Sequence, residues 1–555
     1  MHRSFLSLSF HSFLRRPLSL ALLSGAISLP LAVIPVGCGG ASNSAGESSE
    51  GEGTDLPGAD DAEWTFMVYL NGDNELGASD LGYDGASDDL SEITSGMMGA
   101  GAASDKINVI VLYDQSPLSG DSSTRVYRIT RKGRTKLSTG GAIFSGKEAD
   151  MSLADTLKKF GVWAVRKYPA KKYALILWDH GGGWRSDASA VCANAVVRAN
   201  TSVRANTSVS GCVSDMTSRR CGRAFRTLGT KKPKAAFREF SYDDTDGVDA
   251  EGYYSSITLA DGVYGKALGG ITSAIGGRLD LLGFDACLMG MYEVAAASAP
   301  YADYLVASAE SEPGTGWAYE GFMQALGRTP AMDARTLAQR IVNDYAEQTY
   351  SYLGRKLHFS ATLAAYDLTA MEALTAKLDT FGEAMKAAAA AGGSRRVIES
   401  LAGQVQRFSY REHADLKHLA MLTAARGDEL PAALTGAASD LLEALAQVTV
   451  HYRSQSEASY WGYTHENAYG MAVFFPESMD CAYYRHEANY SYVYESAEYG
   501  YGEDYLYSMQ PCVYYPEEPD GDAAWYSLGE LQDYRKAGWS QGWADFLESY
   551  HRASR

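Results

Sequence analysis

The apolar run YALILW at residues 173–178 leads directly into DHGGGW at residues 179–184. Apolar residues without polar alternation are typical of a strand buried on both faces, as in a parallel sheet covered by helices. Helical patterns at residues 153–165 and 289–297 lie between further runs of this kind, at residues 64–70, 107–113, 279–284 and 304–308. This alternation predicts an α/β fold with a mainly parallel, doubly wound sheet, whose functional site lies beyond the carboxyl ends of the strands.

The composition supports a folded, acidic protein. The 555 residues are 46% hydrophobic and 21% charged, which excludes a disordered or fibrous chain and allows more than one domain. The formal net charge is −19, and it becomes −22 if Arg3, Arg15 and Arg16 are removed by processing. A surface this acidic repels phosphate backbones, so we exclude nucleic acid as a main partner.

Residues 1–37 have the pattern of an export signal. Basic residues precede an apolar run at 17–36, and Pro30 and Pro35 favour a cleaved signal over a membrane span. From Cys38 to residue 62 the chain is rich in Gly, Ser and acidic residues, which is typical of a flexible tether. This start resembles a bacterial lipoprotein signal with Cys38 as the lipidated residue, which implies a membrane-anchored protein of the cell envelope. The alternative is a secreted protein with an ordinary signal and an incidental Cys38.

A His and a Cys follow two of the predicted strands. His180 comes after residues 173–178, and Cys287 lies in DACLMG at residues 285–290, directly after the run at 279–284. This pair suits nucleophilic catalysis, with the thiolate attacking and the imidazole moving the proton. We expect a helix after Cys287 to lower the pKa of the thiol and to stabilise an oxyanion. The alternative is a buried structural Cys and a His that ends a strand.

The His-Gly-Gly-Gly sequence also suits a different chemistry. It occurs as the oxyanion loop of lipases and esterases, whose serine sits on a Gly-x-Ser-x-Gly elbow after a strand. No such elbow follows any of the five predicted strands. We therefore do not expect serine esterase chemistry.

Five segments in order resemble the clostripain-type cysteine peptidases, family C11 of the caspase-like clan. They are the strand and NGDNEL at residues 64–76, LWDHG at 177–181, GFDACLM at 283–289, VASAESEPGTGWAY at 306–319 and YGMAVFFP at 469–476. The resemblance implies a caspase-like α/β/α sandwich, with a peptidase domain at residues 63–480 that contains an insertion at 185–240. A helical and Tyr-rich extension at residues 481–555 follows, and its end, WADFL at 543–547, resembles the family's C-terminal helix.

The resemblance also assigns roles to site residues. It implies that Cys287 is the nucleophile of a thioester acyl-enzyme, that His180 is the general acid and base, and that the N–H groups of Gly181 and Cys287 form the oxyanion hole. It implies that Asp285 lines a pocket for Arg or Lys, although a carboxylate bonded to loop amides is an equal alternative. A second pocket acid would be Glu310 or Glu312. The substrates would be proteins or peptides, and the chemistry needs no cofactor.

The insertion at residues 185–240 is a candidate for self-cleavage. It is rich in Arg and Lys and repeats VRANTS at residues 197–202 and 203–208. Long polar loops tolerate proteolysis. The alternative is a surface insertion stapled by two of its cysteines, Cys192, Cys212 and Cys221.

Two further segments carry weaker signals. The acidic run DDTDGVDAE at residues 243–251 could hold Ca²⁺, although it lacks EF-hand spacing and could simply be a solvated turn before a helix at 258–267. The Tyr-rich segment at residues 483–515 could bind a peptide or a carbohydrate, or form a layer stapled by Cys481 and Cys512.

The sequence thus predicts an exported cysteine endopeptidase. The main alternative is a catalytically silent, caspase-like lipoprotein that acts as a binding module at the cell surface. A metal-dependent hydrolase is a third candidate that lacks a recognisable ligand cluster in the sequence.

Overall fold

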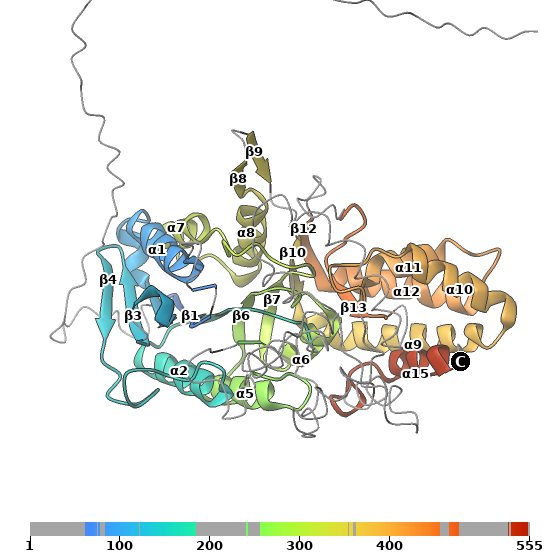
Figure 1. Ribbon diagram of the computed structural model, residues 1–555, viewed down its shortest axis with the longest axis horizontal. Helices are drawn as coiled ribbons and strands as arrows, with labels where there is room; N and C mark the ends of the chain where they lie inside the picture. Colours follow the sequence, from blue (N-terminus) through green and yellow to red (C-terminus); the bar gives the residue numbers. More distant parts are fainter. Residues whose placement is uncertain are drawn as a thin grey trace, which may run out of the picture. The chain divides into compact units, whose positions relative to one another are not determined.

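A computed structural model describes most of the chain after residue 61 (Figure 1). The described residues are 62–74, 76–77, 84–120, 123–184, 240–241, 243, 256–352, 355–358, 362–454, 465–476, 531 and 534–552. The predicted signal, the tether, nearly all of the insertion and the Tyr-rich segment lie outside them, as does every cysteine except Cys287. None of the described helices is both long enough and apolar enough to cross a bilayer.

A nine-stranded sheet forms the centre of the fold, with the order β12-β10-β7-β6-β5-β1-β2-β3-β4. Its five central strands pair in parallel. They are β1 (Trp64–Gly72), β2 (Ile107–Gln115), β5 (Lys172–Trp178), β6 (Leu279–Asp285) and β7 (Ala302–Ala307). These are the five strands that the apolar runs predict, so the parallel α/β core is confirmed.

Antiparallel strands extend the sheet at both edges. They are β3 (Arg125–Thr130) and β4 (Gly133–Leu137) beside β2, and β10 (Thr362–Asp367) and β12 (Thr449–Ser454) beside β7. The sheet is therefore mixed, because its parallel part ends at β2 and β7. These four antiparallel strands, of which β4 and β12 form the edges, were not predicted from the sequence.

Successive side chains of the central strands enter two different cores, because side chains alternate across a strand. Phe66 and Val68 of β1 pack with α1 (Gly85–Met98), α7 (Tyr319–Arg328) and α8 (Ala334–Ala346). Met67 and Tyr69 pack with the helices of the opposite face, α2 (Ala154–Lys167) and α5 (Val263–Ile275). Figure 1 shows these two groups of helices on either side of the sheet. Each fully buried large apolar side chain contributes about 1.5–3 kcal/mol, which explains why runs without polar alternation form these strands.

The remaining helices continue the core on the α2 and α5 face. They are α6 (Tyr292–Ser298), α9 (Met371–Ala389), α10 (Gly392–Gln404), α11 (Leu416–Ala424), α12 (Ala432–Val448) and α15 (Gln541–Arg552). Shorter elements are η1 (Ala102–Lys106), η2 (Pro117–Ser119), η4 (Leu368–Ala370), β8 (Thr349–Tyr352), β9 (Arg355–His358), β11 (His413–Asp415) and β13 (Ala472–Phe474).

One predicted helix starts later than expected. The helix expected at residues 258–267 is α5, which begins at Val263 after Gly262. Gly262 has a φ of 80°, a left-handed conformation that favours glycine. The Asp261 side chain accepts a hydrogen bond from the Val263 N–H, so the start of the helix is set by this turn.

The C-terminal helix α15 lies directly against α9. Trp543, Phe546 and Leu547 of α15 are fully buried. A Cβ atom placed on Gly382 of α9 would lie 2.4 Å from the Trp543 nitrogen, so the two helices are in backbone contact at this glycine. The approach explains why a residue without a side chain stands at this position.

Gly382→Ala therefore separates α9 from α15. We expect the free energy of unfolding to fall by about 1–3 kcal/mol, as for other overpacked sites, measured by denaturant unfolding. Gly403→Ala, inside α10, is the matched control, because its added methyl meets no described atom within 4 Å. Equal effects of the two substitutions would contradict the close contact.

Candidate active site

The ends of β5 and β6 bring His180 and Cys287 to neighbouring positions. Trp178 of β5 pairs with Asp285 of β6, and the Asp179 N–H donates to the Asp285 carbonyl over 3.3 Å. His180 and Cys287 each follow this pair by two residues and are partly exposed. The parallel register thus places the two predicted catalytic residues side by side at the carboxyl edge of the sheet.

Gly181 touches the loop that carries Cys287. A Cβ atom on Gly181 would lie 2.3 Å from the Cys287 carbonyl oxygen and 3.1 Å from the Ala286 Cβ. Only glycine permits this approach, because any other residue would collide with the backbone of the loop. The glycine after His180 therefore sets how close the two strand ends come.

A buried carboxylate orients the chain at His180. Asp179 is 3% exposed and accepts hydrogen bonds from the Nδ2 atoms of Asn71 (2.6 Å) and Asn74 (2.7 Å), and from the backbone N–H of His180 (2.5 Å). Both Asp179 oxygens are engaged by these groups, so the peptide that precedes His180 is tied to the end of β1. Asn71 and Asn74 belong to the NGDNEL segment that resembles the family, but the sequence indicated no role for them.

The loop after Cys287 differs from the expectation. The predicted helix at residues 289–297 begins only at Tyr292, as α6. Leu288 has a φ of 64°, a strained conformation for a bulky residue, and its N–H donates to the Glu310 carbonyl. The Gly290 N–H donates to the Ser308 carbonyl over 2.6 Å. These N–H groups thus bind the chain after β7, and no helix begins at the thiol.

The pKa of the Cys287 thiol is correspondingly raised rather than lowered. Burial raises it to about 11, and the charges of Glu310 and Asp285 act in the same direction. The Glu312 N–H lowers it by donating to Cys287 Sγ over 3.2 Å, but this effect is smaller. The expectation that a helix lowers the thiol pKa is therefore wrong for this structure.

Asp285 lies in a buried acidic pair beside Cys287. Its Oδ2 atom accepts from the Trp317 N–H (3.1 Å) and the Tyr319 hydroxyl (2.8 Å). Burial raises the pKa of Asp285 to about 6, against the hydrogen bonds of Glu312, Tyr319 and Trp317. Burial and the Asp285 charge raise the pKa of Glu312 well above its usual range. Both carboxyl groups are therefore protonated more readily than ordinary acids.

The structure distinguishes Glu310 from Glu312, the two candidates that the sequence left open for a second acid near Asp285. Glu312 binds Asp285 and, through its backbone, Cys287. The Glu310 carboxylate is held instead by His465 Nε2 at 3.0 Å and by the Ser409 N–H. Although burial raises the pKa of Glu310, the His465 and Ser409 hydrogen bonds lower it overall. Glu310 is therefore a structural acid, and no sequence signal pointed to His465.

Trp184 anchors the far end of the His-Gly-Gly-Gly loop. It is fully buried, and its ring meets Phe474, Tyr534 and Trp539 edge-on at centroid distances of 5.1–5.5 Å. Edge-to-face pairs of this kind add about 0.5–1.5 kcal/mol each beyond burial. The C-terminal segment therefore helps to hold the loop that carries His180.

The C-terminal segment also contains a Gly-x-Ser-x-Gly sequence, GWSQG at residues 538–542. Ser540 is fully buried before α15 and follows no strand. Its hydroxyl donates to Asp379 over 2.8 Å and accepts from the Trp543 N–H. This serine caps a helix start, so the sequence is not the nucleophile elbow of an esterase.

A Cys and a His at adjacent strand ends define a candidate cysteine-hydrolase site. The family model described as the Clostripain family, Peptidase_C11, matches residues 68–201 and 261–548, which is more than half of the chain. The chain belongs to the clostripain family.

Individual relatives are more distant. The chain is 29% identical over 315 residues to clostripain of Hathewaya histolytica, an alignment that covers 52% of this chain and 48% of that protein. It thus spans about half the length of this curated relative. A secreted C11 cysteine protease of Bacteroides thetaiotaomicron with an irreversible peptide inhibitor matches with a TM-score of 0.49 and 17% identity, over 75% of this chain and 93% of that one. An inactive zymogen C11 protease of Parabacteroides distasonis matches with a TM-score of 0.45 and 14% identity, over 75% of this chain and 92% of that one.

Gly181→Ala should force the His180 loop away from Cys287. We expect a loss of about 1–3 kcal/mol in the free energy of unfolding, measured by denaturant unfolding. Gly277→Ala is the control, since its added methyl has no described atom within 4 Å. A Gly181→Ala variant as stable as Gly277→Ala would refute the contact with the Cys287 carbonyl.

The acidic pair should make stability depend on pH. The folded-state pKa of Asp285 is about 6 against an ordinary 3.8, so its contribution is fully present below pH 4 and is lost as the pH rises through 6. We expect Asp285→Asn to reduce the loss of stability between pH 4 and pH 7 by up to about 3 kcal/mol, measured by denaturant unfolding at each pH. Asp440→Asn, at an exposed ion pair with Lys377, should leave the pH dependence unchanged.

Proposed function

We propose that this chain is a cysteine endopeptidase that hydrolyses peptide bonds after Arg or Lys. The observation that carries the proposal is the contact between the two strand ends. His180 and Cys287 follow the paired strand ends at equivalent positions, and the backbone N–H of Glu312 donates to Cys287 Sγ. The family membership agrees with this chemistry.

In the proposed mechanism, His180 acts as a general base. A thiol with a pKa of about 11 is almost fully protonated at neutral pH, so the proton must leave as the bond forms. His180 takes this proton while Sγ attacks the carbonyl carbon of the peptide, and the N–H groups of Gly181 and Cys287 hold the oxyanion. The tetrahedral intermediate then expels the amine, which receives the proton from His180. Water hydrolyses the remaining thioester and restores the thiol.

The acidic pair supports a preference for basic side chains. Asp285 is oriented by Trp317 and Tyr319, and the Glu312 carboxyl also accepts from Trp317 Nε1 over 3.1 Å. A guanidinium or ammonium group that reached these carboxyls would favour their ionised form and donate charge-assisted hydrogen bonds to them. A neutral side chain would leave buried acids without a counter-charge, which disfavours it. The alternative is that Asp285 only holds the loop through the Trp317 amide.

Self-processing within residues 185–240 is part of the proposal. Both ends of the insertion are tied to the site: Trp184 is buried in the core, and Phe240 forms bridges with Gly181 and Ile257. A cut in the insertion would therefore leave the residues that flank it, Trp184 and Phe240, held near His180. We further propose that the chain is exported and anchored through Cys38, on the basis of the signal-like residues 1–37.

The assay is cleavage of fluorogenic peptides that end in Arg, Lys, Ala or Asp. We expect the full chain to cleave after Arg or Lys, and Cys287→Ala and His180→Ala to lose turnover by at least about a hundredfold. Asp285→Asn should lose the preference for Arg over Ala while still cleaving. On a denaturing gel, only the active protein should split between residues 185 and 240.

Two outcomes would contradict the proposal at different levels. Turnover after Ala or Asp would keep the dyad but reject the basic pocket. A protein that is folded by circular dichroism yet inactive, even after limited proteolysis of the insertion, would favour the alternative of a binding lipoprotein.

A further inference from the structure

The loop after Cys287 is bound to the segment that follows β7. The Leu288 N–H donates to the Glu310 carbonyl over 3.1 Å, and the Gly290 N–H donates to the Ser308 carbonyl over 2.6 Å. These two bonds form a short ladder between the two segments. The position of the Cys287 loop therefore depends on how firmly the chain is held at Glu310.

The Glu310 carboxylate is held by three separate parts of the chain. In its own loop, the Ser311 N–H donates to Oε1 over 2.7 Å. The Ser409 N–H donates to both oxygens over 3.0–3.2 Å, and His465 Nε2 lies 3.0 Å from Oε2. Glu310 is 4% exposed and His465 is 2% exposed, so water competes little for these bonds. Hydrogen bonds to a carboxylate are stronger than those between neutral groups, so this cluster fixes Glu310 firmly.

The loop needs an anchor because it is strained at Leu288. This residue is buried and has a φ of 64°, a left-handed conformation that a bulky residue keeps only where its surroundings enforce it. The bond from its N–H to Glu310 is a restraint at the strained residue itself. The same segment reaches the thiol, because the Glu312 N–H donates to Cys287 Sγ. Release of Glu310 would let Leu288 relax and would shift the thiol beside it.

The charge of Glu310 does not favour the nucleophile. It raises the pKa of the Cys287 thiol, as the charge of Asp285 does. What Glu310 contributes to attack by the thiol is therefore geometric. His465 stacks on Phe408 at a centroid distance of 6.3 Å, and this contact holds its ring next to the carboxylate.

We propose that Glu310 and His465 are positioning residues for the attack of Cys287. They hold Leu288 in its strained conformation, which fixes the direction in which Sγ leaves the strand end. The two residues lie 155 positions apart in the chain, so no motif relates them. The inference rests on the peptidase function proposed above, but the restraint on the loop can be measured without turnover.

Three substitutions separate the contributions of the pair. Glu310→Gln keeps an oxygen for the Ser409 N–H but removes the charge. His465→Leu removes the donor, whereas His465→Gln places an amide nitrogen where Nε2 stands. The matched controls are Glu372→Gln, at an exposed acid of α9, and His451→Gln, at a partly buried histidine of the edge strand β12.

Hydrogen exchange measures the restraint directly, in full chains that also carry Cys287→Ala to prevent self-cleavage. In peptides that contain residues 286–291, we expect the amides of Leu288 and Gly290 to exchange at least about tenfold faster in Glu310→Gln and His465→Leu than in the parent. His465→Gln and the two controls should exchange at the parent rate. The amides of β1 and β5 should stay protected, which distinguishes a released loop from unfolding.

Turnover of an Arg peptide gives the second measurement, in chains that retain Cys287. We expect kcat of Glu310→Gln and His465→Leu to fall by about tenfold to a hundredfold with KM little changed, because misplacement of the reacting groups acts on the chemical step. His465→Gln should recover most of kcat. Alkylation of Cys287 by iodoacetamide should be no slower in Glu310→Gln than in the wild type, since loss of a negative charge favours the thiolate.

The inference fails if exchange at Leu288 and Gly290 is unchanged, or if KM rises while kcat stays constant, which would make Glu310 part of the substrate pocket. Faster exchange throughout the sheet would reduce the pair to a general stabilising contact. If Glu310→Gln does not fold, the comparison of His465→Leu with His465→Gln gives the answer. A wild-type chain that cleaves no peptide would reject the proposed function, and the exchange result alone would then decide whether the pair holds the loop.

Discussion

The parallel pairing of β5 with β6, in register at Trp178 and Asp285, is the constraint on which the site depends. It makes the two strands end at the same level, so that His180 and Cys287 leave the sheet together. Gly181 then allows the two chains to touch at the Cys287 carbonyl. The register is itself held by alternating burial on both faces, because a slip of one residue would exchange the two cores.

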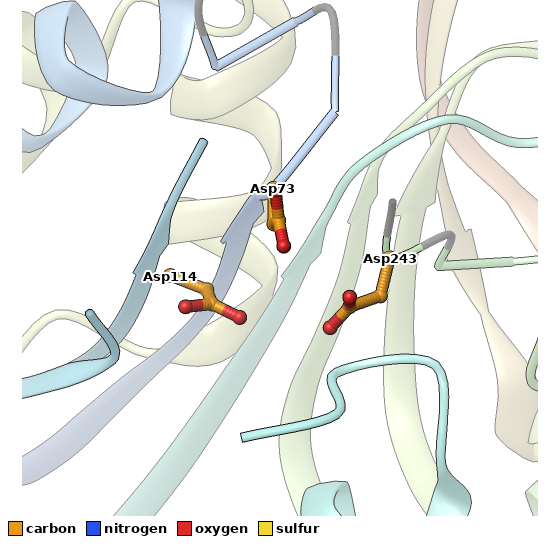
Figure 2. A group of neighbouring side chains, drawn as sticks. All are labelled: Asp73, Asp114 and Asp243. Atoms are coloured by element: carbon orange, nitrogen blue, oxygen red, sulfur yellow. The ribbon is translucent and has the colours of Figure 1, made fainter. Parts of the chain in front are cut away.

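Around this edge the protein buries acids in two different ways. Asp285 and Glu312 lie beside the thiol and are supplied with donors by Trp317 and Tyr319. Burial raises the pKa of both carboxyls. The carboxylates of Asp73, Asp114 and Asp243 each have one oxygen within 4.8 Å of the others at this edge (Figure 2), and Asp114 Oδ2 accepts no hydrogen bond from the described residues.

The C-terminal segment contributes to the site although it lies far away in the sequence. Tyr534 and Trp539 pack on Trp184, and α15 meets α9 through Gly382. The end of the chain therefore shares the core of the sheet, and its packing supports the loop that carries His180. A helix at this end was predicted from the sequence, but nothing in the sequence indicated which loop the segment would hold.

Local patterns account for what could be predicted from sequence. Uninterrupted apolar runs identified β1, β2, β5, β6 and β7, because burial on both faces leaves a continuous signature. The antiparallel strands β3, β4, β10 and β12 were missed, because each contains polar residues that interrupt or flank its apolar ones. The helix expected at Cys287 was wrong because Leu288 and Gly290 bind the backbone after β7, a contact between distant segments.

The sequence by itself determined the α/β class, the candidate pair His180 and Cys287, and the resemblance to the clostripain family. Only the tertiary structure decided that Glu312 rather than Glu310 joins Asp285, that Asn71 and Asn74 hold Asp179, and that Asp73, Asp114 and Asp243 converge. The physical reason is that an apolar run shows its burial within a few residues. The partner of a polar side chain depends instead on strand register and on loops that meet from distant parts of the chain.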